Sequence, residues 1–200
     1  IYIVGYTDPQ AIDANDIWII QSNNDGDLKE KRKISSPNGD EDITQIRWIA
    51  NSQFFFTGVN QTQDNLIYGT FSYDGSNINV DYVKQVPALG GCVRSPKFMI
   101  DEYRDVFILW DVYNNANGKF EKIQLGKLAL DTANSTQADA QGNQVQVPWL
   151  WRKTLTPQGN YVSIKNTGLH VDVFGDVVVT AAIDYDEDRK VNIVSSLKYD

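Results

Sequence analysis

Runs of consecutive apolar residues recur along the chain, and each run ends at a small or aromatic residue. The first class comprises residues 1–5 (IYIVG), 54–58 (FFFTG), 106–110 (VFILW) and 177–181 (VVVTA). Short continuous runs rich in β-branched and aromatic side chains predict strands that are covered on both faces. Helices would need apolar positions three and four residues apart over longer windows, and this spacing is not found. The pattern therefore predicts an all-β protein.

A second apolar strand follows each of these runs and closes on an Asp or Asp-Gly turn. Its four copies are residues 17–25, 66–74, 123–131 and 192–200. When the copies are set in register, Gly69, Gly126 and Ser195 occupy one column of small residues. Four copies that align in this way indicate an internal repeat.

The copies are about 50 residues apart, with about 70 residues between the third and the fourth. Repeats of this length that are rich in short strands are typical of β-propeller blades, each a four-stranded antiparallel sheet. We therefore predict a β-propeller of about four blade units within a single segment, residues 1–200. The units are residues 1–42, 43–95, 96–158 and 159–200.

Flanking strands complete each predicted blade. Outer strands are expected at residues 28–34, 80–86 and 149–155, and inner strands at residues 43–49, 97–101 and 161–172. The order is inner strand, two middle strands, outer strand. The chain begins on the second strand of a blade and stops after the third strand of another. We therefore expect it to be part of a longer propeller, with a closed four-bladed ring as the alternative.

The third unit carries a polar insertion at residues 132–147 (TANSTQADAQGNQVQV), where the other units have a short turn. Loops of this length are uncommon and are usually functional or disordered. Two interpretations stay open. The insertion either contacts a neighbouring subunit or is a mobile surface excursion.

Composition narrows the function classes. No apolar run approaches the roughly 20 residues that span a bilayer, so membrane insertion is not expected. The net charge of −8 argues against a nucleic-acid surface, because phosphate neutralisation needs clustered Lys and Arg. The one basic cluster, Lys29 to Lys33, falls on a predicted outer strand, where charge prevents strand pairing between molecules.

Candidate chemistry is sparse. Cys92 is the only cysteine, which excludes an intrachain disulfide and a cysteine zinc site, and we interpret it as a buried or tolerated thiol. His170 is the only histidine, and we interpret it as structural. The acidic clusters at residues 23–27, 38–42 and 184–188 lack the full spacing of a calcium loop and are interpreted as turns.

A propeller glycosidase would need two carboxylates placed across a sugar, and the sequence marks out no such pair. Tryptophan side chains can stack on sugars, but most of those in this chain fall in or beside predicted strands, so we assign them to the core. They are Trp18, Trp48, Trp110, Trp149 and Trp151. The sequence therefore predicts no catalytic, cofactor-binding or metal-ligating residue, and no cofactor.

The blades resemble a known repeat family. The segments IYIVGYT, DIWIIQSNNDGDL and WLWRKTL are similar to bacterial and viral propeller repeats, in which a strand ending in Gly-Tyr-Thr precedes one closing on Asp-Gly. The composition is rich in Asn, Gln, Tyr and Asp and has few Cys, Met or His. In this it resembles large virion structural proteins of contractile-tailed phages, including cyanophages. Trp110 and Ala181 depart from the pattern, because Gly stands there in the other copies.

This resemblance implies a non-enzymatic structural or adhesion module of a virion, in the tail or on the particle surface. Its expected partners are other virion or surface proteins and a host-surface glycan or receptor. The alternatives are a secreted or periplasmic carbohydrate-active propeller enzyme and a bacterial surface scaffold propeller. No functional residue is carried over, because such blades share only a structural consensus.

Overall fold

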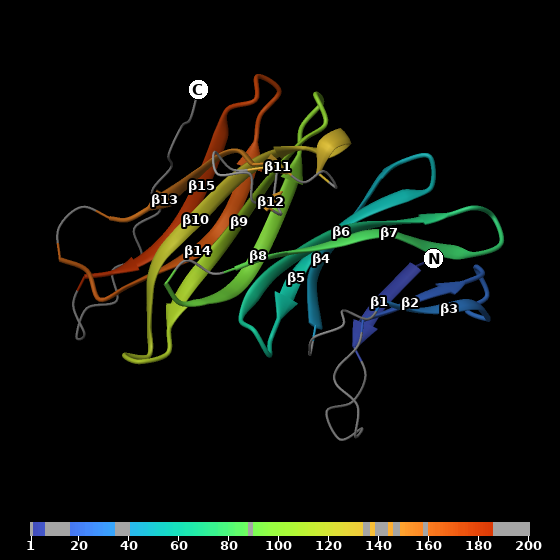
Figure 1. Ribbon diagram of the computed structural model, residues 1–200, viewed down its shortest axis with the longest axis horizontal. Helices are drawn as coiled ribbons and strands as arrows, with labels where there is room; N and C mark the ends of the chain where they lie inside the picture. Colours follow the sequence, from blue (N-terminus) through green and yellow to red (C-terminus); the bar gives the residue numbers. More distant parts are fainter. Residues whose placement is uncertain are drawn as a thin grey trace. The chain divides into compact units, whose positions relative to one another are not determined.

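The computed structural model describes residues 2–6, 17–34, 41–87, 90–133, 137–138, 144–145, 149–157 and 160–185. The chain divides into two compact units, Ile1–Pro87 (unit 1) and Ala88–Asp200 (unit 2), and each has a core of its own. The described strands are antiparallel throughout (Figure 1). The prediction of an all-β protein is confirmed.

Unit 1 contains two sheets whose strands follow chain order. The three-stranded sheet is formed by β1 (Tyr2–Tyr6), β2 (Ile17–Ser22) and β3 (Leu28–Ile34). The four-stranded sheet is formed by β4 (Glu41–Ala50), β5 (Gln53–Asn60), β6 (Asn65–Tyr73) and β7 (Ile78–Val86).

Unit 2 repeats this arrangement around an insertion. Its four-stranded sheet is formed by β8 (Cys92–Ile100), β9 (Asp105–Asn114), β10 (Lys119–Ala129) and β13 (Trp149–Leu155). Between β10 and β13 lie a 3-10 turn, η1 (Leu130–Thr132), and a hairpin of β11 (Gln137–Ala138) and β12 (Gln144–Val145). The next sheet pairs β14 (Ser163–Val171) with β15 (Val177–Asp184).

The predicted strand windows coincide with observed strands. The first-class runs lie in β1, β5, β9 and β15, and the second-class runs lie in β2, β6 and β10. The last second-class window, residues 192–200, is outside the described residues. In both four-stranded sheets the strands lie side by side in chain order, β4-β5-β6-β7 and β8-β9-β10-β13, as predicted for the second and third units. Short apolar runs of this kind suit strands because they bury side chains on alternating faces.

The core of unit 1 lies between its two sheets. Phe56, Ile67, Phe71 and Ile78 from the four-stranded sheet pack with Ile19 from β2, and all five are fully buried. Phe54 and Phe71 stand opposite each other on β5 and β6, with ring centroids 4.8 Å apart. Burial of each such side chain stabilises the fold by about 1.5–3 kcal/mol.

The core of unit 2 is built in the same way. Phe107, Leu109 and Leu125 from the four-stranded sheet meet Val177 and Val179 from β15. Strand β14 lies against β8, β9 and β10. In both units, therefore, two sheets that follow one another in the chain pack face to face.

The column of small residues exists because bulky groups occupy the space where a side chain would stand. A Cβ at Gly69 would overlap the carbonyl oxygen of Tyr82 and lie 2.7 Å from the Phe56 ring. A Cβ at Gly126 would overlap the ring of Trp149, which stacks on Trp110 at 5.8 Å between centroids. Gly126 thus makes room for the Trp149 ring, which in turn covers Trp110, one of the two departures from the repeat.

The substitution Gly69→Ala is expected to lower the free energy of unfolding by about 1–3 kcal/mol, because the added methyl group overpacks the sheet. Urea unfolding followed by tryptophan fluorescence measures the change. Ser76→Ala, at an exposed turn position of the same sheet, serves as the control and should stay within about 0.5 kcal/mol of the wild type. Equal unfolding midpoints for all three proteins would contradict the packing argument.

Candidate functional site

Two five-residue turns of unit 2 share one construction. Asp101–Asp105 joins β8 to β9, and Asp172–Asp176 joins β14 to β15. In the first turn, Asp101 Oδ1 accepts the N–H groups of Tyr103 (3.0 Å) and Asp105 (2.8 Å). In the second, the equivalent Asp172 oxygen accepts those of Phe174 (2.8 Å) and Asp176 (2.9 Å). The leading carboxylate therefore fixes the backbone of each turn.

The fourth residue of each turn has left-handed backbone geometry, with φ of 65° at Arg104 and 82° at Gly175. Each donates its N–H to the carbonyl oxygen of the leading Asp, at 3.2 and 3.1 Å respectively. Glycine adopts this geometry without steric cost, whereas it is uncommon for arginine. The Arg104 conformation is retained because its side chain and carbonyl oxygen are both bound.

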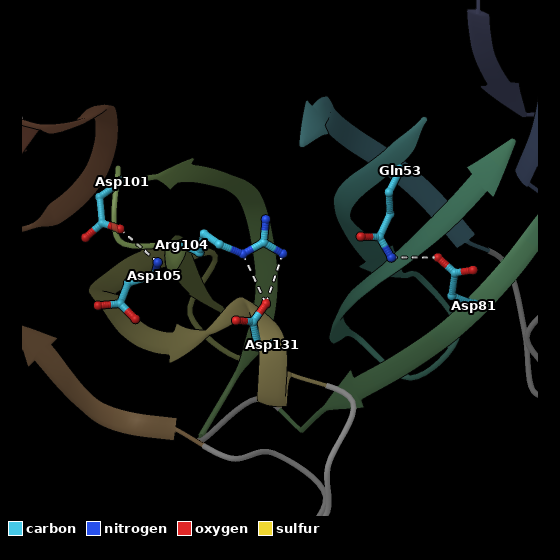
Figure 2. A network of polar contacts seen from close by, with 6 residues as sticks. All are labelled: Gln53, Asp81, Asp101, Arg104, Asp105 and Asp131. Carbon is cyan, nitrogen blue, oxygen red and sulfur yellow. Dashed lines mark hydrogen bonds and ion pairs between the residues drawn. The ribbon is translucent and has the colours of Figure 1, made fainter. Parts of the chain in front are cut away.

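Arg104 connects its turn to the base of the insertion, as Figure 2 shows. Its Nε and Nη2 donate to Asp131 Oδ1 at 3.1 and 2.9 Å, and its carbonyl oxygen accepts the N–H of Leu130 at 2.9 Å. Lys127 Nζ lies 2.7 Å from Asp105 Oδ2. The Arg104–Asp131 pair is exposed and contributes at most about 1 kcal/mol, but it fixes where the chain leaves the sheet.

Both turns expose an aromatic ring at their third position. Tyr103 is 69% exposed and Phe174 is 84% exposed. The turns project from the same end of unit 2, at the top of the view in Figure 1. We call residues 101–105, 130–132 and 172–176 the turn end. Exposed rings on rigid backbone are typical of contact surfaces, because little conformational entropy is lost on binding.

Unit 1 has a polar network of its own, and Figure 2 shows its bond between Gln53 and Asp81. Asp81 on β7 accepts hydrogen bonds from Gln53 Nε2 (3.0 Å), Thr70 Oγ1 (3.0 Å) and Ser72 Oγ (2.9 Å). All the donors are neutral, and they lie on β5 and β6. The network therefore ties three strands together on one face of the sheet.

A buried carboxyl group lies on β9. Asp111 is 1% exposed and accepts the N–H of Asn166 at 2.7 Å, while Asn166 Nδ2 donates to the carbonyl oxygen of Ser95 at 3.3 Å. Burial raises the pKa of Asp111 to about 6, against the opposing effects of the hydrogen bonds from Asn166 and of the charges on Lys97 and Lys165. This arrangement links β9 and β14 and can bind or release a proton near pH 6.

The arrangement does not form a recognisable catalytic or metal site. A glycosidase would need a second carboxylate across a substrate cleft. The carboxylate of Asp111 instead accepts the backbone N–H of Asn166 on β14, a strand of the sheet packed against β9. Within the described ranges, no group of three or more His, Cys, Asp or Glu side chains could hold a metal ion.

The candidate residues named from the sequence have different outcomes in the structure. Cys92 is buried, in agreement with its interpretation as a structural thiol. His170 lies exposed on β14. In the first acidic cluster, Asn23 Oδ1 accepts the N–H groups of Asp25 (3.0 Å) and Asp27 (2.8 Å), which confirms a turn. The other two clusters lie partly outside the described residues.

The core assignment of the tryptophans holds only in part. Trp110 is 1% exposed, and Trp151 contacts Phe107 with ring centroids 6.1 Å apart. Trp48 on β4 is 60% exposed, so its assignment to the core is wrong. β4 is covered only in part: Glu41 is its one buried residue, and Arg47 and Trp48 are both exposed. The side chain of Trp18 lies outside the described residues.

The basic cluster Lys29 to Lys33 lies on β3, at the edge of the three-stranded sheet, as predicted. The insertion at residues 132–147 begins within η1 and includes the hairpin β11–β12. Leu130 and Asp131, which precede the insertion, are hydrogen-bonded to Arg104 of the Asp101–Asp105 turn.

The sequence contains a signal for the turn end that the strand pattern overlooks. Residues 101–106 read DEYRDV and residues 172–177 read DVFGDV, so Asp, an aromatic residue, Asp and Val recur at the same positions. Each copy immediately precedes a first-class apolar run. This second alignment would have located both turns and both exposed rings.

Comparisons with protein-family models, with curated proteins and with solved structures found no match for the chain. A search of the described residues for a helix long and apolar enough to cross a membrane also found none.

The buried carboxyl group of Asp111 makes stability depend on pH. The folded state holds this proton up to about pH 6, whereas the unfolded side chain releases it near pH 3.9. The folded state thus binds more protons between these values, and the Asp111 contribution to the free energy of unfolding falls as pH rises through this window, by roughly 2–3 kcal/mol.

Urea unfolding of the wild type and of Asp111→Asn, from pH 4 to pH 7.5, measures this contribution as the difference between the two profiles. Asparagine can still accept the Asn166 N–H, so the variant should lose the Asp111 slope and keep its fold. The control variant Glu102→Gln lacks an exposed carboxylate beside the same sheet. Its pH profile should still differ from that of Asp111→Asn, as the wild-type profile does. Parallel profiles for wild type and Asp111→Asn would show that Asp111 ionises freely.

Proposed function

We propose that this chain is a non-enzymatic structural or adhesion module: a β-propeller segment of a tailed-phage virion, in the tail or on the particle surface. The observation that carries the proposal is the repeated antiparallel four-stranded sheet, with each sheet covered by the next sheet of the same unit. The virion setting rests on the resemblance of the repeat and on the residue usage.

The packing inside unit 1 supports a radial arrangement. Outer strand β3 of the first sheet lies against outer strand β7 of the second, and β1 lies against inner strand β4. The edges therefore match, inner region with inner region and outer strand with outer strand. Blades around an axis require this match. Unit 2 does not repeat it, because β14 lies against β8, β9 and β10, so the support comes from unit 1 alone.

The turn end supports a role in contact. Its aromatic rings stand on backbone that is fixed by carboxylate hydrogen bonds, and these turns are short connections of a rigid sheet. A rigid scaffold that carries exposed contact groups on turns is a common basis of recognition. The partner is another particle protein or a host-surface receptor.

Mass spectrometry of phage particles purified from infected host cultures tests the virion setting. Tryptic peptides of this chain, such as residues 128–152, should appear at a constant ratio to known particle proteins. Their presence only in the soluble lysate would overturn this part of the proposal. A structure of the full-length gene product tests the propeller: sheets ordered around one axis support it, and a two-layer sandwich contradicts it.

The contact role predicts a loss of binding in the double variant Tyr103→Ser, Phe174→Ser. Removal of two exposed aromatic contacts should weaken attachment of the labelled chain to host cells or particles about tenfold or more. Leu150→Ser, an exposed apolar position on β13, is the matched control and should bind as the wild type does. Wild-type attachment by the double variant would exclude the turn end as the contact surface.

The rival function, a carbohydrate-active enzyme, makes a separate prediction. It requires release of reducing sugar from a glycan panel, and loss of that release in a carboxylate variant. Asp111→Asn is the appropriate variant because burial gives this carboxyl group a pKa of about 6. Hydrolysis that depends on Asp111 would replace the adhesion proposal with the enzymatic one.

A further inference from the structure

Unit 2 has a groove at the end opposite to the turn end. It lies beside the β9–β10 hairpin, which points downward in Figure 1, and beside the start of β14 and the end of β15. Two pockets of about 370 and 350 Å³ adjoin at Lys119 and Val162, and the groove comprises both. We call it the lysine groove. This size is within the range of small-ligand sites.

The groove concentrates positive charge in an acidic chain. Its lining includes three lysines, Lys119, Lys122 and Lys165, but only two carboxylates, Glu121 and Asp184, whereas the whole chain has a net charge of −8. An excess of ammonium groups in a concave site attracts anions.

Neutral donors engage both carboxylates of the groove. Glu121 Oε1 accepts hydrogen bonds from Asn114 Nδ2 (2.7 Å) and Asn117 Nδ2 (2.8 Å), and these amides lower the pKa of Glu121. Asp184 Oδ2 accepts the hydroxyl of Ser163 at 3.0 Å. The carboxylates are therefore oriented by amide and hydroxyl groups of the groove wall.

The walls of the groove are fixed by specific contacts. The hydroxyl of Tyr161 donates to the carbonyl oxygen of Glu121 at 2.5 Å and connects the β13–β14 segment to β10. The ammonium group of Lys165 lies 4.2 Å from the centroid of the Phe120 ring, which holds a cation over an aromatic face. Lysines held in this way lose less conformational entropy when they bind an anion.

We propose that the lysine groove binds an acidic sugar, with the sugar carboxylate between the lysines. Ammonium groups form strong charge-assisted hydrogen bonds to carboxylates. The hydroxyl of Thr156 lies along the same lining, and the hydroxyl oxygen of Ser163, whose hydrogen is donated to Asp184, can accept a hydrogen bond from a sugar hydroxyl. The groove lies away from the turn end, so this inference does not depend on the proposed virion role.

Calorimetric titration of the full chain with glucuronic acid at pH 7 tests the proposal. Binding should weaken when sodium chloride rises from 50 to 200 mM, because salt screens the ammonium groups. Glucose and inorganic sulfate are the comparison ligands, and each should bind at least about tenfold more weakly than glucuronate. Glucose binding equal to glucuronate would refute the charge argument, and sulfate binding equal to glucuronate would refute the sugar.

The double variant Lys122→Gln, Lys165→Gln removes one lysine from each pocket and should weaken glucuronate binding about tenfold or more. Lys153→Gln is the matched control, because Lys153 also lies over an aromatic ring, that of Trp151, and does not line the groove. Thermal unfolding checks that both variants are folded. In the wild type, glucuronate should shift the amide resonances of Lys119, Val162 and Ser163. An absence of binding, or shifts confined to other residues, would overturn the proposal.

Discussion

The structure depends on coverage of one sheet by the next. An isolated antiparallel sheet with apolar residues on both faces would leave rows of Phe, Ile and Val side chains in water. In unit 1 this exposure is avoided because Ile19 of one sheet packs among Phe56, Ile67 and Phe71 of its neighbour. At about 25 cal/mol per Å² of buried apolar area, this contact outweighs the contribution of an exposed ion pair such as Arg104–Asp131. Sheet order, turn positions and polar networks are arranged around this contact.

Two kinds of polar feature are compatible with that constraint. Carboxylates at sheet ends, such as Asp101 and Asp172, bind backbone N–H groups and leave the faces free to pack. Asp111 lies between sheets, where the hydrogen bonds from Asn166 oppose its desolvation only in part. Carboxylates of the first kind fix the turns that carry exposed rings, whereas Asp111 makes the contact between β9 and β14 depend on pH. The two kinds of group therefore affect different properties of the protein.

The strands are predictable because the constraint is visible in the sequence. Continuous runs such as residues 54–58 and 106–110 mark strands buried on both faces, and their recurrence predicts the order of strands within each sheet. The candidate sites are less predictable. The lysine groove brings together Lys119 and Lys165 from separate strands, and no local pattern encodes that proximity. The core assignment of Trp48 is wrong because its position on β4 is open to solvent, and residue type alone does not reveal which strand positions are covered.

The position of the Trp149 ring, over Gly126 and against Trp110, has a consequence for how such repeats diverge. The Trp149 ring occupies the space where a side chain at position 126 would stand, so a large ring on one strand requires a glycine on the next. Substitutions at these sites are then coupled in pairs across strands. Repeat copies can lose their mutual sequence likeness well before they lose a common shape.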